Sequence, residues 1–216
     1  LPMRSQAAEV VEAADGSLNS EIHVIRALGA EAARRSKRHK VVLMIDLGDL
    51  REGVLPAAAA ELALDAARTP GIELEGLGTN LTCFGGVCPT PENLGRLVEL
   101  ADLIGRRLGR SLETVSGGNS STLLLAKAGG LPRGITQLRI GEGIMLGRET
   151  VERRPIPGAH LDAFRLVAEV IEVKDKPSVP IGEIGQDAFG NKPTFVDRGV
   201  RRRAIAALGR QDAVLE

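Results

Sequence analysis

The residues best suited to chemistry gather in two glycine-rich segments, residues 115–121 and residues 138–143. Each follows a short apolar run that we expect to be a strand. Together they provide hydroxyl groups, backbone N–H groups beside glycines, and the fixed positive charge of Arg139. These features suit a phosphate group carried on an aromatic ring, because glycines let the backbone approach an anion closely.

The first segment lies between an expected strand and an expected helix, and the start of a helix favours an anion. Ser116 and Ser120 supply hydroxyl groups, Asn119 supplies an amide, and Gly118 leaves room for a ligand. Taken alone, the segment fits a simple capped turn equally well.

The second segment places Arg139 inside an apolar run, where an unpaired charge would be very costly. Its acceptor is either an unprotonated ring nitrogen or, alternatively, the carboxylate of Glu142 or Asp46. The backbone N–H groups of Gly141 and Glu142 can reach a phosphate.

A third segment, residues 44–53, adds charged side chains after another apolar run. Arg51 can hold a substrate carboxylate in a two-pronged hydrogen bond, and Asp46 and Asp49 can orient it. The alternative, which this segment alone favours, is a solvated loop in which Asp49, Arg51 and Glu52 pair with one another.

Alternating patterns predict the elements that position these segments. We expect strands over residues 17–19, 40–46, 72–78, 112–115 and 136–140, and helices over residues 5–14, 20–35, 56–68, 91–108 and 120–128, with Ser20 as the N-cap of the second. This order predicts an α/β fold with a mainly parallel sheet, and we interpret it as an incomplete TIM-type (β/α)8 barrel that lacks its first strands. The three segments, and Asn80 after the third strand, then lie at the carboxyl ends of strands, where barrel enzymes hold their catalytic groups.

The sequence pattern changes after about Leu161. Residues 164–173 and 201–209 resemble strands, and prolines and glycines lie between them. We therefore divide the chain into a partial barrel, residues 1–160, and the beginning of a β-rich C-terminal domain, residues 161–216.

Composition excludes several classes of partner. Among 216 residues, 28 Lys and Arg balance 28 Asp and Glu, so no basic surface predicts a nucleic-acid partner. No apolar run predicts a membrane span, and the three His and two Cys residues have no metal-site spacing. We expect a cytoplasmic protein in which Cys83 and Cys88 are reduced, with a disulfide or half of a metal site as alternatives.

These motifs resemble the alanine racemase-like, fold-type III pyridoxal-phosphate (PLP) enzymes, and are most similar to the branch of alanine/ornithine racemases. The resemblance rests on residues 42–53, 76–83, 116–121 with 138–142, and 180–190. It implies a PLP-dependent amino-acid racemase, an isomerase of amino-acid metabolism that acts through a carbanion. The implied partner is a small-molecule amino-acid substrate, and the full-length parent is expected to be a homodimer.

The resemblance also implies roles for individual residues. Arg139 would face the pyridine nitrogen, and Arg51 would position the cofactor oxygen or the substrate carboxylate. The phosphate would be held by Ser120 and by backbone N–H groups near Gly118, Gly141 and Glu142. Asn80 replaces a histidine of better-known alanine racemases and Met44 replaces a modified lysine, so a substrate larger than alanine is favoured.

The family's Schiff-base lysine and tyrosine base have no counterpart in this chain. Lys40 lies at the wrong end of its strand, Lys127 lies late on a helix, and there is no Tyr. We expect an internal fragment that contains no catalytic residue and is inactive alone. The alternatives are a non-catalytic PLP-binding protein of the same barrel family and a fold-type III D-amino-acid aldolase or decarboxylase.

Overall fold

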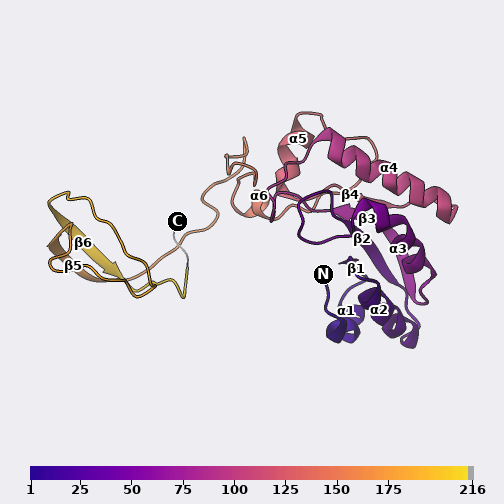
Figure 1. Ribbon diagram of the computed structural model, residues 1–216, viewed down its shortest axis with the longest axis horizontal. Coiled ribbons are helices and arrows are strands. Elements are labelled where there is room, and N and C mark those ends of the chain that lie inside the picture. Colours follow the sequence, from indigo (N-terminus) through magenta and orange to yellow (C-terminus); the bar gives the residue numbers. More distant parts are fainter. Residues whose placement is uncertain (214–216) are drawn as a thin grey trace. The chain divides into compact units, whose positions relative to one another are not determined.

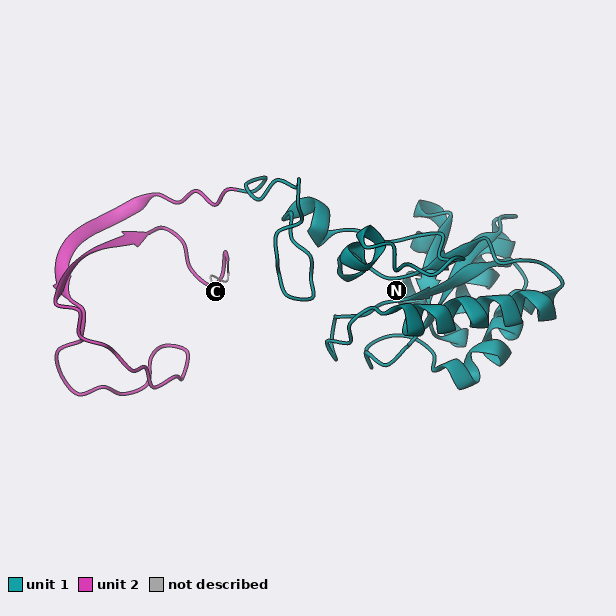
Figure 2. Cartoon of the chain, turned by 90° about the horizontal axis from the view of Figure 1, so that it is seen from above, with its two compact units in different colours: residues 1–164 teal, residues 165–216 magenta. Residues whose placement is uncertain are grey.

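The computed structural model describes residues 1–213, which form two compact units with a boundary between Phe164 and Arg165 (Figure 2). No helix in this part of the chain is both long and apolar enough to cross a membrane. Each unit is described by itself.

The first unit is built on four parallel strands in the order β1-β2-β3-β4 (Figure 1). They are β1 (Gly16–Asn19), β2 (His39–Ile45), β3 (Ile72–Thr79) and β4 (Thr114–Ser116). A Cβ atom on Gly76 would lie only 1.9 Å from the carbonyl oxygen of Thr114, so glycine is required where β3 pairs with β4. The predicted α/β fold with a parallel sheet is confirmed.

Helices connect these strands in sequence and cover one face of the sheet. The main ones are α1 (Ala7–Ala13), α2 (Ile22–Arg34), α3 (Pro56–Arg68) and α4 (Pro91–Leu108), and the short ones are η1 (Arg4–Gln6), η2 (Ser120–Thr122), α5 (Leu123–Lys127) and α6 (Glu142–Met145). Alternate residues of β2 pack against the helices in the main core, including Val41, Leu43 and Ile45. The other face of β2 carries Met44, whose sulfur lies 3.0 Å from the position of a Cβ atom on Gly78.

α4 shows how local signals fix an element. The side chain of Thr90 accepts the N–H of Asn93 and the side chain of Asn93 accepts the N–H of Thr90, which forms a capping box. Pro91 occupies the first turn, and Gly109, with φ +68°, ends the helix in the left-handed conformation.

Two predictions about helices were wrong. The N-cap of α2 is Glu21, one residue after Ser20, because Glu21 is still extended and its carboxylate accepts the N–H of His23. The expected helix over residues 120–128 is divided into η2 and α5. The expected strand over residues 112–115 is confirmed as β4, with bounds shifted by one or two residues.

The expected strand over residues 136–140 does not form. The N–H groups of Thr136 and Gln137 both bond to the carbonyl of Val115, and Gln137 forms a single parallel bridge with Ser116. Beyond it the partner chain turns at Gly118, with φ +108°, so the ladder cannot continue. The segment therefore follows the turn after β4 instead of extending the sheet as a strand.

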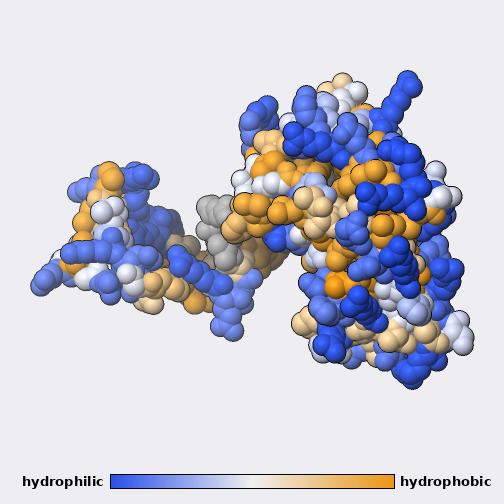
Figure 3. Space-filling view, turned by 45° about the vertical axis from the view of Figure 1, so that its right-hand side comes forward, coloured by the Kyte–Doolittle hydropathy of each residue, from blue (hydrophilic) through white to orange (hydrophobic). Residues whose placement is uncertain are grey.

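The second unit contains an antiparallel pair, β5 (Val170–Pro177) and β6 (Val200–Ala206). Its strands expose apolar side chains, including Ile171, Val173 and Ile205. Figure 3 shows apolar residues among hydrophilic ones at the surface. A two-stranded ribbon buries little apolar surface, and the hydrophobic core of the described residues lies in the first unit.

Candidate functional site

The candidate site is formed where three parallel strands end. The loops after β2, β3 and β4 begin at Asp46, Asn80 and Gly117, and these strands are parallel neighbours in the sheet. Side chains from these loops therefore meet at the carboxyl edge of the sheet, as the sequence predicts.

Hydrogen bonds join the two glycine-rich segments. The N–H of Arg139 donates to the carbonyl oxygen of Gly118 at 2.9 Å, and the N–H of Gly143 donates to the hydroxyl of Ser120 at 2.9 Å. A further bond of 2.9 Å runs from the N–H of Gly117 to the carbonyl of Gln137. The structure thus brings both segments into one cluster.

This cluster has the donors that a phosphate needs. Within residues 1–213, the backbone N–H groups of Gly118, Asn119, Gly141 and Glu142 have no acceptor. A Cβ atom on Gly141 would meet no atom within 4 Å, so the space beside this residue is open. The hydroxyl of Ser120 accepts one bond and retains its own proton to donate. The donors suit an anion with several oxygens, so these residues fit the phosphate of PLP.

Arg139 is half-buried and is held by neutral acceptors. Its guanidinium donates to the hydroxyl of Ser116 and, at 2.8 Å, to the carbonyl oxygen of Thr79. Burial lowers the pKa of Arg139, and the negative charge of Glu52 opposes that effect. A guanidinium nevertheless stays protonated in a protein, so Arg139 supplies a fixed charge at the end of β4.

The alternative ion pairs of Arg139 are not formed within the described residues. Glu142 instead pairs with Arg153 at 2.6 Å. Asp46 uses its Oδ1 to accept the N–H groups of Gly48 at 2.8 Å and Leu50 at 3.1 Å, which stabilises its own turn.

Arg51 pairs with its chain neighbour, Glu52. The Nε and Nη2 atoms of Arg51 donate to the two carboxylate oxygens, the second at 2.9 Å. This pairing raises the pKa of Arg51, and hydrogen bonds from Arg51 and then from Asn80 hold the pKa of Glu52 below its ordinary value. One part of the alternative loop pairing, Arg51 with Glu52, is therefore present.

A chain of amides continues from Glu52 to the first glycine-rich segment. Asn80 donates to Oε1 of Glu52 at 3.2 Å, and Asn119 donates to Oδ1 of Asn80 at 2.7 Å. The Oδ1 of Asn119 in turn accepts the N–H of Ser121 at 2.8 Å. All three loops are thus connected through side chains.

Asp49 does not join the pairing of Arg51 with Glu52. It is buried, and its carboxylate accepts the N–H groups of Cys83 at 3.1 Å, Phe84 at 2.8 Å and Val87 at 3.1 Å. Burial raises the pKa of this carboxyl, but hydrogen bonds from backbone N–H groups outweigh burial, so the pKa of Asp49 is lowered. Asp49 therefore anchors the loop after β3 to the loop after β2.

Two contributors were missed as site residues. The sequence predicts Glu52 only as part of a solvated loop, although its position beside Arg51 is a usable signal. The carbonyl of Thr79 contributes through its backbone, so its residue type gave no signal.

Both cysteines are free and exposed. The sulfur of Cys83 accepts a bond from Asn119 at 3.3 Å, and desolvation raises the pKa of this thiol. Cys83 therefore touches the edge of the site as a protonated thiol.

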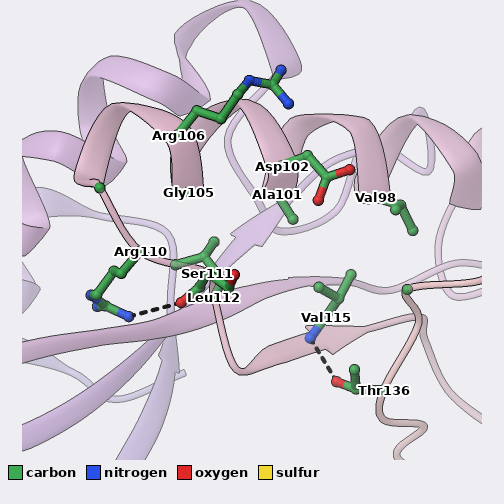
Figure 4. Close-up of a pocket in the computed structure, with 12 residues that line it drawn as sticks. Val98, Ala101, Asp102, Gly105, Arg106, Arg110, Ser111, Leu112, Val115 and Thr136 are labelled. Carbon is green, nitrogen blue, oxygen red and sulfur yellow. Dashed lines mark hydrogen bonds between the residues drawn. The ribbon is translucent and has the colours of Figure 1, made fainter.

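Two pockets lie near the sheet of the first unit. One, of about 510 Å³, lies between α4 and β4 and has Asp102, Arg106 and Arg110 around it (Figure 4). None of the predicted site residues lines it. A second, of about 440 Å³, is lined by Arg139 together with Lys40 and Glu75. Arg139 thus lies both in the loop cluster and at the wall of this second pocket.

The chain is similar to known racemases over most of its length. A family model described as alanine racemase, N-terminal domain, matches residues 2–149. The ornithine racemase of Acetoanaerobium sticklandii is 47% identical over 213 residues, which are 98% of this chain and 60% of that protein. The lysine racemase of Thermotoga maritima is 45% identical over 213 residues, 98% of this chain and 59% of that protein. The chain spans about three fifths of the length of these curated relatives.

Solved structures show the same fold. An alanine racemase of Clostridium difficile 630 has a TM-score of 0.59 and 14% identity, over 94% of this chain and 51% of that chain. The D-threonine aldolase of Filomicrobium marinum has a TM-score of 0.56 and 21% identity, over 73% of this chain and 45% of that chain. At these identities the likeness establishes the barrel-type fold alone, and the barrel is incomplete in this chain.

Proposed function

We propose, because this chain belongs to the alanine racemase N-terminal domain family, that it forms the cofactor-binding part of a PLP-dependent amino-acid racemase. The observation that carries the proposal is the cluster of unpaired N–H groups, the Ser120 hydroxyl and the Arg139 guanidinium at one sheet edge. The similarity to an ornithine and a lysine racemase favours a diamino acid as substrate.

Different residues of the cluster would bind different parts of the cofactor. The phosphate would be held by Ser120 and by the N–H groups of Gly118, Asn119, Gly141 and Glu142. Arg139 would donate to the ring nitrogen, and Ser116 and Asn80, which belong to the same hydrogen-bonded cluster, would line the space for the ring. PLP, when bound, supplies delocalisation of the negative charge that develops on the α-carbon.

Arg139 favours racemisation over other outcomes. Because a guanidinium retains its proton, a ring nitrogen that accepts its hydrogen bond would stay largely unprotonated. PLP held in this way would supply weaker delocalisation, which is the chemistry that favours racemisation.

Arg51 is proposed to bind the carboxylate of the substrate at the mouth of the site.

The Schiff-base lysine and the tyrosine base are expected to lie outside this chain, and we propose that the full-length protein is a homodimer. Lys40, the lysine of β2, is paired with Glu75 at 3.0 Å. Purified full-length protein loaded with PLP should interconvert the L- and D-forms of ornithine or lysine, as measured by chiral chromatography, whereas this chain alone should not.

Substitution Ser120→Ala tests the phosphate site. In the full-length protein we expect PLP affinity to fall about tenfold, because a hydrogen bond to a charged group contributes roughly 1.5–3 kcal/mol. Titration of the apoprotein with PLP, followed by cofactor absorbance, measures the change. The exposed residue Ser111 gives a matched control, Ser111→Ala, with unchanged affinity. An unaltered affinity in Ser120→Ala would place the phosphate elsewhere.

A further inference from the structure

Glu52 differs from an ordinary surface carboxylate in its burial and in its hydrogen-bond partners. Its side chain is only 16% exposed, although that of its partner Arg51 is 46% exposed. The carboxylate accepts bonds from Arg51 in its own loop and from Asn80 in the loop after β3. It is thus fixed from two directions.

The pairing leaves one side of Arg51 available. Glu52 engages the side of the guanidinium that carries Nε and Nη2. Within the described residues, Nη1 donates to no acceptor, so the end of the guanidinium that carries Nη1 and the second proton of Nη2 remains open. A carboxylate can bind two such parallel N–H groups at once.

The amide of Asn80 limits the movement of Glu52. Asn119 donates to the oxygen of Asn80, so the amino group of Asn80 must face Glu52. Asn119 is itself fixed by the N–H of Ser121. The orientation of the Asn119 amide therefore fixes the orientation of the Asn80 amide. This series of hydrogen bonds ends at the carboxylate of Glu52, which accepts from Asn80.

We propose that Glu52 is a positioning residue that holds Arg51 in the orientation in which its open end binds the substrate carboxylate. This inference rests on the proposed function. Exposed ion pairs contribute little, because their long side chains must be ordered and water screens the charges. Here the neighbouring loop already fixes the carboxylate, so Arg51 is pre-organised before substrate arrives.

The test uses Glu52→Gln and Glu52→Asp in the full-length protein loaded with PLP. Glutamine retains an oxygen for Asn80 but removes the charge and one of the two acceptors for Arg51. We expect Glu52→Gln to raise the KM for the amino acid about tenfold while kcat changes less than threefold, and to weaken acetate binding, measured by cofactor absorbance, by a similar factor. Glu52→Asp, which restores the charge, should recover part of both losses.

Glu61→Gln is the matched control, because Glu61 also pairs with an arginine, Arg107 at 3.1 Å, but is exposed on α3. It should change neither KM nor acetate binding, and thermal unfolding should be the same in all variants. An unchanged KM and acetate affinity in Glu52→Gln would overturn the inference and leave the proposed function intact. A wild-type protein that binds no PLP would overturn both.

Discussion

Arg139→Ala is expected to lower the affinity of the full-length protein for PLP about a hundredfold. The substitution removes the guanidinium that bonds both to Thr79, at the end of β3, and to Ser116, in the first glycine-rich segment. Its contribution is large because the charge is half-buried and already fixed by neutral acceptors, so binding requires no reorganisation. A charge-assisted bond of roughly 1.5–3 kcal/mol corresponds to about a ten- to hundredfold change.

The measurement is a PLP titration of the apoprotein, with unfolding in urea to show that the variant remains folded. Arg107→Ala is the matched control, since Arg107 is an exposed arginine of α4 that pairs only with Glu61 among the described residues. Arg139→Lys should recover little affinity, because a lysine cannot span both acceptors and the cofactor with one ammonium group. If Arg139→Ala binds PLP as the wild type does, the ring nitrogen is not bound at this residue.

The place of Arg139 in the fold could be predicted from the sequence only in part. Its buried charge and the glycines around it predicted a site at the strand ends, and the structure joins the two segments there. The same run was wrongly predicted to be a strand, since apolar residues at 136–140 gave no indication that the partner backbone would turn at Gly118. Local patterns predict elements well where caps mark their ends, as Thr90 and Gly109 do for α4.

The pairing partners of the site could not be predicted in the same way. Arg51 and Glu52 are adjacent, but the importance of Glu52 depends on Asn80, which is 28 residues further along the chain. Which carboxylate faces which loop is decided by the register of β2 and β3. Asp49 illustrates the same limit, because its partners lie in a loop more than 30 residues away.

Asp49→Ala is expected to lower the free energy of unfolding of the protein by about 3 kcal/mol. The variant leaves the N–H groups of Cys83, Phe84 and Val87 without their acceptor, and a donor that loses its partner away from water costs roughly 1–3 kcal/mol. Because Cys83 and Phe84 are exposed, water replaces Asp49 for some of these groups, so the expected loss lies at the low end of their summed cost. The loop after β3 should loosen, and the Cys83 thiol should react faster with a disulfide reagent.

The effect of Asp49 should also depend on pH with a definite sign. The pKa of its carboxyl is lowered in the folded protein, so its stabilisation is fully present above the unfolded pKa of about 3.9 and is lost as the pH falls through the lower folded value. Urea unfolding of the wild type and of Asp49→Ala should therefore differ most near neutral pH and converge in acid. Asp102→Ala, an exposed carboxylate of α4, should show neither effect. A constant difference down to the lowest pH at which the protein folds would show that Asp49 acts through packing alone.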